Sequence, residues 1–267
     1  MVFKADREAA FVRRFGKFKR PNGVAIVHGA RFNSGTKDLA LVTDRDGNAT
    51  YVYSIPDFSL IGTFAEDVRQ PMGISAYKRL SDGATVVFVV VKQAKNDDKV
   101  IRYRLVEQRG KISGIREIQF GGEIAPGEES IVVDGVRNLV FVADEKARNV
   151  KVYDTDGRWK ITIGQGHFQE DVEGLALAEC GGRRLLIGTD QTSPTEFEVF
   201  EFPEFRHVGT VHTTAQNTDG IALTQTRLPD YPDGLFVAHS DPDGSGGRHA
   251  EFYDLGQILR SIKVTCR

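Results

Sequence analysis

The sequence contains few of the residues that form disulfides or bind soft metal ions. Its 267 residues include only two cysteines, two methionines and one tryptophan. Cys180 and Cys266 lie far apart, and the absence of a Cys-x-x-Cys pair excludes a zinc-ribbon type of site. The two residues form either a disulfide that ties down the C-terminus or two separate thiols. Cysteine usage therefore leaves the redox compartment open.

Long apolar runs and charge of one sign are also lacking. No run of about 18 apolar residues is present, which predicts no membrane span. The formal net charge is -2 with mixed signs, so the basic stripe typical of nucleic-acid binders is absent. Residues 1–20 are basic but lack the apolar core of a signal peptide, so we expect no leader in this chain and leave its localisation open. We expect a monomer.

Two kinds of catalytic motif are missing as well. No Gly-x-Ser-x-Gly is present, which removes support for a serine hydrolase. The six histidines have no metal-ligand spacing, so each is predicted to be a surface or hydrogen-bonded residue.

A strand-rich repeat is what the sequence does contain. Five segments begin with a turn-like residue, usually glycine, and continue with apolar alternation: NGVAIV at Asn22, MGISAY at Met72, ESIVVD at Glu129, EGLALA at Glu173 and DGIALT at Asp219. Each is followed by a second apolar run, such as NLVFVADE, and a third, such as NVKVYDT. Short alternating runs between Gly, Asp and Asn indicate strands and turns.

The repeat spacing of about 45–55 residues fits the three or four strands of a β-propeller blade. We therefore predict an all-β fold, with residues 1–267 as a single β-propeller domain of five full blade repeats. Fourth strands are predicted at SLIGTF, KITIG and HVGTV, and one helical turn at DLGQIL. The N-terminal AAFVRRFGKF is interpreted as the outer strand of a blade, which would close the ring and remove a sheet edge.

The first strand of each blade lines the channel of a propeller, so equivalent residues converge there. The residue before the glycine position is in turn Asn22, Met72, Glu129, Glu173 and Asp219. Three carboxylates brought together repel one another unless a cation neutralises them. Oxygen ligands without nearby His or Cys suit Ca²⁺ or Mg²⁺. The alternative is that each acid is an ordinary turn residue.

A second polar series follows the second strands: Asp44, Lys92, Asp144 with Glu145, Asp190 and Asp241, with Arg45 next to Asp44. The plain interpretation is a solvated turn, and we favour it for Asp190 and Asp241.

At these residues the chain resembles the β-propeller phytase family. The likeness extends from about residue 16 to the end and follows the order of that family's second to sixth blades. It is carried by RPNGVAIVHGARFNSGTKDLALVTDRDGNATYVYSI, QPMGISAYKR, GEESIVVDGVRNLVFVADE, EDVEGLALAECGGRRLLIGTDQ and NTDGIALTQTRLPDYPDGLFVAHSD.

The resemblance implies a function. The family hydrolyses phytate, an inositol hexakisphosphate, with several Ca²⁺ ions, and is mostly secreted or periplasmic. Carried over by position, it implies calcium ligands at Glu129, Glu145, Glu173 and Asp219. It implies catalytic roles for Glu129, Glu173 and Tyr77, and binding of a phosphorylated small molecule by Arg45 and Lys92. An Arg fork and a Lys point charge both suit phosphate.

The chain departs from the family in two places. Ser130 stands where the family has glycine, and only about 20 residues precede the second-blade match, so most of the first blade is missing. The fold is then five-bladed, or a six-bladed ring with one blade reduced. Two other functions stay open: a non-catalytic propeller that binds a partner or a phosphorylated ligand, and a calcium-dependent lactonase-type propeller.

Overall fold

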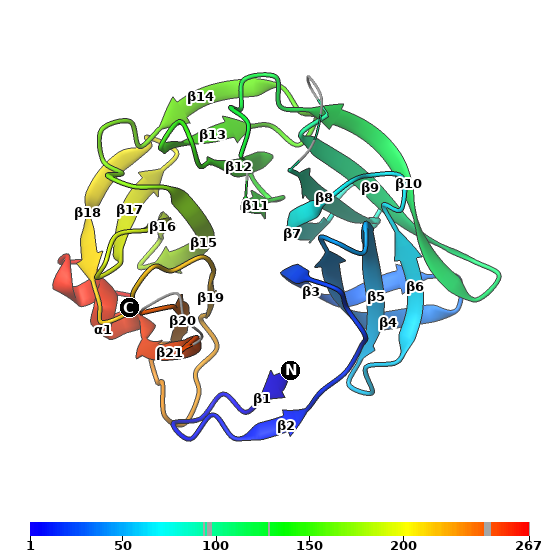
Figure 1. The fold of residues 1–267 in the computed structure, drawn as a ribbon, viewed down its shortest axis with the longest axis horizontal. Helices are drawn as coiled ribbons and strands as arrows, with labels where there is room; N and C mark the ends of the chain where they lie inside the picture. The colour runs from blue at the N-terminus through cyan, green and yellow to red at the C-terminus, as the bar shows by residue number, and fades with distance from the viewer. Residues whose placement is uncertain (93, 95–97, 128, 243–246, 267) are drawn as a thin grey trace. The chain divides into compact units, whose positions relative to one another are not determined.

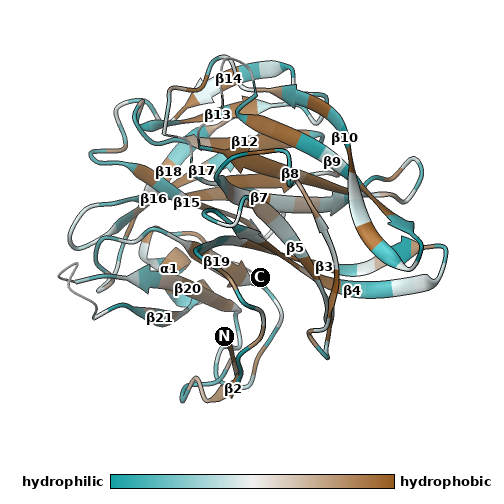
Figure 2. Cartoon of the chain, turned by 45° about the vertical axis from the view of Figure 1, so that its right-hand side comes forward, coloured by the Kyte–Doolittle hydropathy of each residue, from teal (hydrophilic) through white to brown (hydrophobic). Residues whose placement is uncertain are grey.

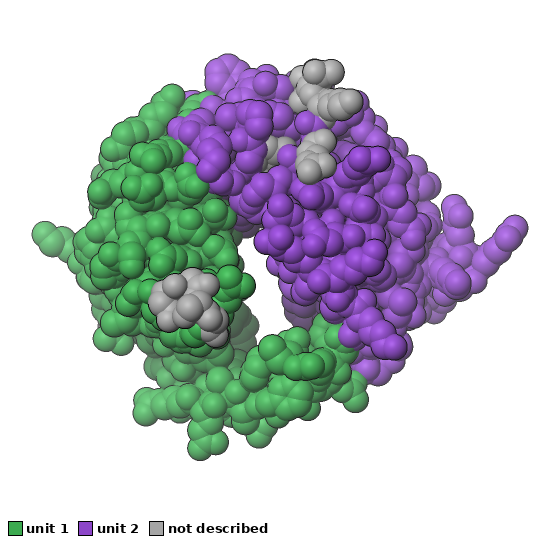
Figure 3. Space-filling view, in the orientation of Figure 1, with its two compact units in different colours: residues 1–15, 148–150, 162–267 green, residues 16–147, 151–161 purple. Residues whose placement is uncertain are grey.

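The computed structural model describes residues 1–92, 94, 98–127, 129–242 and 247–266. Contacts within the chain divide it into two compact units, which Figure 3 shows in different colours. Unit 1 comprises residues 1–15, 148–150 and 162–267, and unit 2 comprises residues 16–147 and 151–161. In the described part of the chain, no helix has the length and apolar character needed to cross a membrane.

Unit 2 contains an eight-stranded sheet that consists of two four-stranded antiparallel halves, each with its strands in chain order (Figure 1). The first consists of β3 (Pro21–Phe32), β4 (Gly35–Asp44), β5 (Ala49–Ile55) and β6 (Leu60–Phe64). The second consists of β7 (Pro71–Lys78), β8 (Thr85–Val91), β9 (Val100–Gln108) and β10 (Lys111–Phe120). The outer strands β6 and β10 meet at a single parallel pair, Gly62 with Ile112, where a Cβ on Gly62 would collide with the Ile112 carbonyl.

A further sheet has the strand order β11-β12-β13-β14, and the boundary between the units falls within β13 and β14. Its strands are β11 (Ile131–Asp134), β12 (Leu139–Asp144), β13 (Asn149–Tyr153) and β14 (Trp159–Ile163). Unit 1 then contributes β15 (Val172–Cys180), β16 (Arg183–Asp190), β17 (Glu196–Phe202) and β18 (Arg206–His212). Its last sheet is β19 (Ile221–Thr224), β20 (Leu235–Ser240) and β21 (His249–Asp254), followed by helix α1 (Leu255–Ser261).

The second strands of two repeats, β8 and β12, are buried along their whole length. All seven residues of β8 and all six of β12 are buried, and Figure 2 shows both strands as strongly hydrophobic. A strand buried on both faces needs a continuous apolar run, which β-branched residues supply well. The outer strand β14 is by contrast exposed at Trp159 and Ile161. The apolar runs of the sequence thus mark the middle of each sheet.

In three of the five repeats, the opening glycine permits close approach between neighbouring first strands. In unit 2, a Cβ on Gly23 would lie 2.7 Å from the Met72 carbonyl oxygen, and one on Gly73 would collide with the Glu129 carbonyl. In unit 1, a Cβ on Gly174 would lie 2.8 Å from the Ile221 nitrogen. At Gly23, Gly73 and Gly174, glycine is therefore required by the packing of the strands.

Several predicted elements are confirmed. SLIGTF, KITIG and HVGTV form β6, β14 and β18, each the fourth strand of its repeat. DLGQIL supplies α1, whose N-cap Asp254 accepts a hydrogen bond of 2.7 Å from the Gln257 nitrogen. The repeat β7 to β10 also has four strands, and its outer strand β10 was not indicated by the sequence patterns.

The prediction for the N-terminal stretch is wrong. Within the described residues, β2 (Phe11–Arg13) pairs with β1 (Val2–Phe3) in a sheet of its own instead of joining a four-stranded repeat. The first strand of the first repeat also keeps one apolar face open, because Val24 and Ile26 are 60% and 50% exposed while Ala25 and Val27 are buried.

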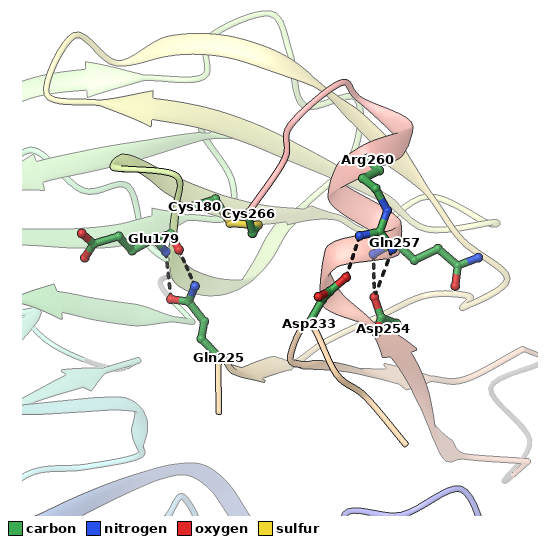
Figure 4. Close-up of a disulfide and its surroundings, with 8 residues drawn as sticks. All are labelled: Glu179, Cys180, Gln225, Asp233, Asp254, Gln257, Arg260 and Cys266. Atoms are coloured by element: carbon green, nitrogen blue, oxygen red, sulfur yellow. Dashed lines mark hydrogen bonds and ion pairs between the residues drawn. A yellow bond between two sulfur atoms is a disulfide. The ribbon is translucent and has the colours of Figure 1, made fainter. Parts of the chain in front are cut away.

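Of the two states left open for the cysteines, the structure contains the disulfide. Figure 4 shows Cys180, the last residue of β15, bonded to Cys266 in the C-terminal tail. Next to it, the side chain of Gln225 bonds the main chain of Glu179 in both directions, with a donor–acceptor distance of 2.9 Å from the Glu179 nitrogen. The disulfide anchors the chain after α1.

Candidate functional site

Arg45, Lys92 and Glu145 all belong to unit 2 and occupy the same place in three successive repeats. Each is the first residue after a second strand, following β4, β8 and β12. Main-chain hydrogen bonds support this equivalence for Arg45 and Lys92. The Arg45 nitrogen donates to the Arg20 carbonyl at 2.9 Å, and the Lys92 nitrogen donates to the Gln70 carbonyl at 3.1 Å. The comparison of the repeats in sequence makes Lys92 equivalent to Asp44. In the structure, Lys92 is instead equivalent to Arg45, one residue further along.

Lys92 stands between two carboxylates. Its ammonium forms an ion pair with Glu129 and lies 3.6 Å from Oε2 of Glu145. Lys146 lies on the other side of Glu145, with Nζ 2.6 Å from Oε1. The side chains of Glu129 and Glu145 are only 14% and 10% exposed. The structure therefore brings together Lys92, Glu129 and Glu145, three of the predicted site residues.

Arg45 belongs to the same electrostatic neighbourhood. The pKa of Glu129 is raised from its usual 4.5, chiefly because burial disfavours the charged form. Lys92 opposes this shift in the pKa, as does Arg45, while the nearby Glu145 carboxylate adds to it. Nε of Arg45 is buried and makes no hydrogen bond to the described residues. A guanidinium with an unused buried donor has capacity left for an anion.

The donor set fits a hard divalent cation. Oε2 of Glu145 is buried and accepts no hydrogen bond from the described residues, so one carboxylate oxygen is available as a ligand. Glu129 adds a second carboxylate next to it, and carboxylate oxygens are the ligands that Ca²⁺ prefers. At present the ammonium of Lys92 supplies the neutralising charge.

Two predicted ligands, Glu173 and Asp219, lie on neighbouring strands of unit 1. Glu173 is in β15 and Asp219 stands two residues before β19, and the close approach of Gly174 to Ile221 brings these strand starts together. The Asp219 carboxylate accepts a hydrogen bond of 2.7 Å from Nε2 of Gln191 and lies 3.6 Å from Nδ1 of His239.

Gln191 was missed by the sequence analysis. It is the first residue after β16, which is the position that Arg45, Lys92 and Glu145 hold in the sheets of unit 2. A comparison of the residues that follow each second strand, rather than of the acids alone, would have found it.

Tyr77 lies away from Lys92. It pairs with Val86 at one end of β8, whereas Pro71 pairs with Val91 at the other, beside Lys92. Six residues of strand separate Pro71 from Tyr77, about 20 Å at the usual rise of a strand. The Tyr77 ring stacks on Phe88 with 6.2 Å between ring centroids. Tyr77 therefore packs against the core at the opposite end of the sheet.

The aspartates of the second series are buried. Asp190 is fully buried and accepts hydrogen bonds from the nitrogens of Gln169 and Glu170, at 2.8 Å and 2.7 Å. Asp241 is 9% exposed, and its carboxylate accepts a bond of 2.8 Å from Nε of Arg248. The prediction of solvated turns at these two residues is wrong. Asp190 instead satisfies the main chain just before β15.

Comparisons with known proteins show the fold and go no further. No family model matches the chain, and no curated protein matches it by sequence. Similar solved structures include a nidogen/laminin complex, with a TM-score of 0.62 and 15% identity over 91% of this chain and 78% of that chain.

Two other structures are similar at comparable identity. BBS1N in complex with ARL6DN has a TM-score of 0.59 and 13% identity over 97% of this chain and 69% of that chain. Hydrazine synthase of Kuenenia stuttgartiensis has a TM-score of 0.54 and 15% identity over 85% of this chain and 57% of that chain. Together with the four-stranded antiparallel sheets, these likenesses define an all-β, β-propeller-like fold.

Proposed function

We propose that the chain is a phytase-like, calcium-dependent phosphohydrolase that acts on phytate or a related phosphate ester, in a propeller with one blade for each of its five repeats. The observation that carries the proposal is the grouping of Arg45 and Lys92 with the buried carboxylates of Glu129 and Glu145 in unit 2. Acids that can hold a hard cation next to cations that can hold phosphate are the parts that metal-assisted phosphoryl transfer needs.

The residues divide the work by their chemistry. Glu129 and Glu145 would hold Ca²⁺ in unit 2, and Glu173 and Asp219 are the proposed ligands in unit 1. A bound calcium ion would lower the pKa of its water and offset charge on the phosphoryl oxygens. Arg45 would bind phosphate oxygens through its planar fork, and Lys92 would exchange its contact with Glu129 for one with phosphate.

The test measures phosphate release from phytate in Ca²⁺ and in chelator. We expect release from the wild type in Ca²⁺ only, and a loss of at least about tenfold in Glu129→Gln and Arg45→Gln. Glu107→Gln is the matched control, because Glu107 lies at the end of β9 far from Val100, which pairs with Val90 close to Lys92. A wild type that releases no phosphate in Ca²⁺ contradicts the proposal.

One observation favours a second candidate, a non-catalytic propeller that binds a phosphorylated ligand. Nε of Arg45 makes no hydrogen bond to the described residues, so its guanidinium is a cationic group that can bind an anion without any metal. Such a group attracts phosphate directly. Calorimetric binding of phytate in chelator, with no phosphate released in Ca²⁺, would select this function over hydrolysis.

A further inference from the structure

Two histidines and a glutamate from two adjacent strands and a more distant loop meet on one face of a sheet in unit 1. Ligand atoms of His167, Glu198 and His207 all lie within 4.8 Å of one another. Nε2 of His207 is 2.5 Å from Oε2 of Glu198. The ring of His167 stacks on that of His207, with 4.0 Å between centroids. This group lies outside the acids and cations of the proposed phosphate site.

A β-bulge creates the face. In the pairing of β17 with β18, Glu198 lies opposite Thr210 and Phe200 lies opposite His207. The register shifts between Val199 and Phe200. The shift puts His207 and Thr210, three residues apart, on the side of the sheet that carries Glu198. Regular alternation would have put them on opposite sides. This is why spacing in the sequence did not reveal the pair of histidines.

His167 reaches this face from a firmly held loop. Its nitrogen donates to the Gly164 carbonyl at 3.0 Å. The next residue, Phe168, is buried against Phe200, with 5.9 Å between ring centroids. Asp190 fixes the following two nitrogens. The imidazole of His167 is thus exposed to solvent but placed by a rigid main chain.

Glu198 is oriented for a ligand. Its side chain is only 4% exposed, and Oγ1 of Thr210 lies 3.1 Å and 3.2 Å from its two oxygens. A hydrogen bond from a neighbouring side chain is the usual support of a metal-binding carboxylate. A buried acid, supported in this way and facing two imidazoles, has the His₂Glu composition that zinc accepts.

We propose that His167, Glu198 and His207 form a binding site for Zn²⁺. Tetrahedral zinc holds its ligand atoms about 3 to 3.5 Å apart. To reach that spacing, the exposed His167 ring would turn away from its stacked position on His207. The ion replaces the proton between His207 and Glu198, which is released to solvent. The exposure of His167 leaves a fourth position open to water. Bound zinc would tie the 164–170 loop to β17 and β18.

The test uses the full chain, stripped with chelator and then titrated with Zn²⁺ in excess Ca²⁺, so that hard-oxygen sites are occupied. Bound zinc is measured by equilibrium dialysis and elemental analysis, and thermal unfolding is followed in parallel. We expect a single equivalent of zinc, an affinity at least about tenfold lower in His167→Gln and in His207→Gln, and a rise in Tm with zinc in the wild type that these two variants lack.

His212→Gln is the matched control. His212 is 71% exposed and lies 3.2 Å from Glu196 on the same pair of strands, outside the three-residue group. It should bind zinc as the wild type does. Because His167 is exposed, its substitution leaves the core intact, and the visible spectrum of tetrahedral Co²⁺ gives a second readout. A wild type that takes up no zinc, or a His167→Gln variant that binds it with unchanged affinity, overturns the proposal.

Discussion

Thr43 shows how a single polar side chain joins two repeats of unit 2. The residue is fully buried near the end of β4. Its Oγ1 accepts a hydrogen bond of 2.8 Å from the Gly23 nitrogen and donates one of 2.5 Å to the Met72 carbonyl. One hydroxyl therefore satisfies two main-chain groups on neighbouring first strands, β3 and β7. Leaving such groups unpaired in the core costs about 1–3 kcal/mol each.

This geometry makes Thr43→Val destabilising although valine has the same shape. We expect the free energy of unfolding to fall by about 2 kcal/mol, because the Gly23 N–H and the Met72 carbonyl lose their partner. Thr85→Val is the matched control: Thr85 is 2% exposed, and its Oγ1 has no hydrogen-bond partner among the described residues. Removing that hydroxyl should be neutral or stabilising. Chemical denaturation of both variants decides, and equal losses would contradict the assignment.

Glu129 gives a second prediction at the residue scale. Its pKa in the folded protein is raised above the usual 4.5, mainly by burial. The folded state therefore binds the proton more tightly than the unfolded state, and stability falls as pH rises from about 4.5 through the raised pKa. In chelator, Glu129→Gln escapes this loss. We expect its stability relative to the wild type to increase between acidic and neutral pH.

The opposite sign is expected for Glu107→Gln. Hydrogen bonds from the side chain and nitrogen of Ser34 lower the pKa of Glu107 below its usual 4.5. The stability that this carboxylate contributes is present above pH 4.5 and is lost as pH falls through the lowered pKa. Urea unfolding of the two variants across the same pH range should give differences that diverge. If the stability differences of the two variants change with pH in the same way, burial does not control the pKa of Glu129.

At the scale of elements, the apolar alternation was sufficient to place most strands. NLVFVADE and NVKVYDT lie on β12 and β13, because a strand buried on both faces leaves a long apolar run. The outer strand β10 escaped detection because four of its ten residues are exposed and only Ile112 and Phe120 along it are apolar and buried. Sequence pattern reports burial, and an outer strand offers little of it.

The residues of the candidate site could be predicted from the sequence only in part. Glu129 was predicted from its place in the repeat and Glu145 from the resemblance to the phytase family, and the structure puts both beside Lys92. The alignment of Lys92 was one residue off, because β4 and β12 end in aspartate whereas β8 ends in Val91. The His167–His207 pair depends on a bulge and a loop, and neither leaves a periodic signal.

The glycines that open the repeats carry a prediction at this scale. Gly73→Ala would push a Cβ into the Glu129 carbonyl, and the three atoms nearest to that Cβ are all main-chain atoms, so no flexible side chain can move aside. We expect a loss of about 3 kcal/mol in the free energy of unfolding. Gly220→Ala is the control, since Gly220 opens the last repeat with nothing within 4 Å of the added Cβ. That variant should stay within about 0.5 kcal/mol of the wild type.

At the scale of the whole chain, the disulfide closes a long covalent loop. Cys180 and Cys266 are 86 residues apart, and the closed loop holds β16 to β21 and α1. Chain-entropy arguments give such a loop about 4 to 5 kcal/mol of stabilisation, through the constraint on the unfolded chain. A bond of this kind persists in an oxidising compartment.

We therefore expect Cys266→Ala to lower the Tm markedly and to remove its sensitivity to reductant. The wild type should fall to the Tm of the variant when the bond is reduced, because both chains then have the same open loop. The buried Cys180, 1% exposed, stays as a small apolar side chain in the variant, so the comparison isolates the cross-link. Thermal scans with and without reductant give the Tm values, and thiol titration of the unfolded wild type reports whether the bond has formed. A wild-type Tm that ignores the reductant while its thiols become titratable would show that the loop constraint does not stabilise this chain.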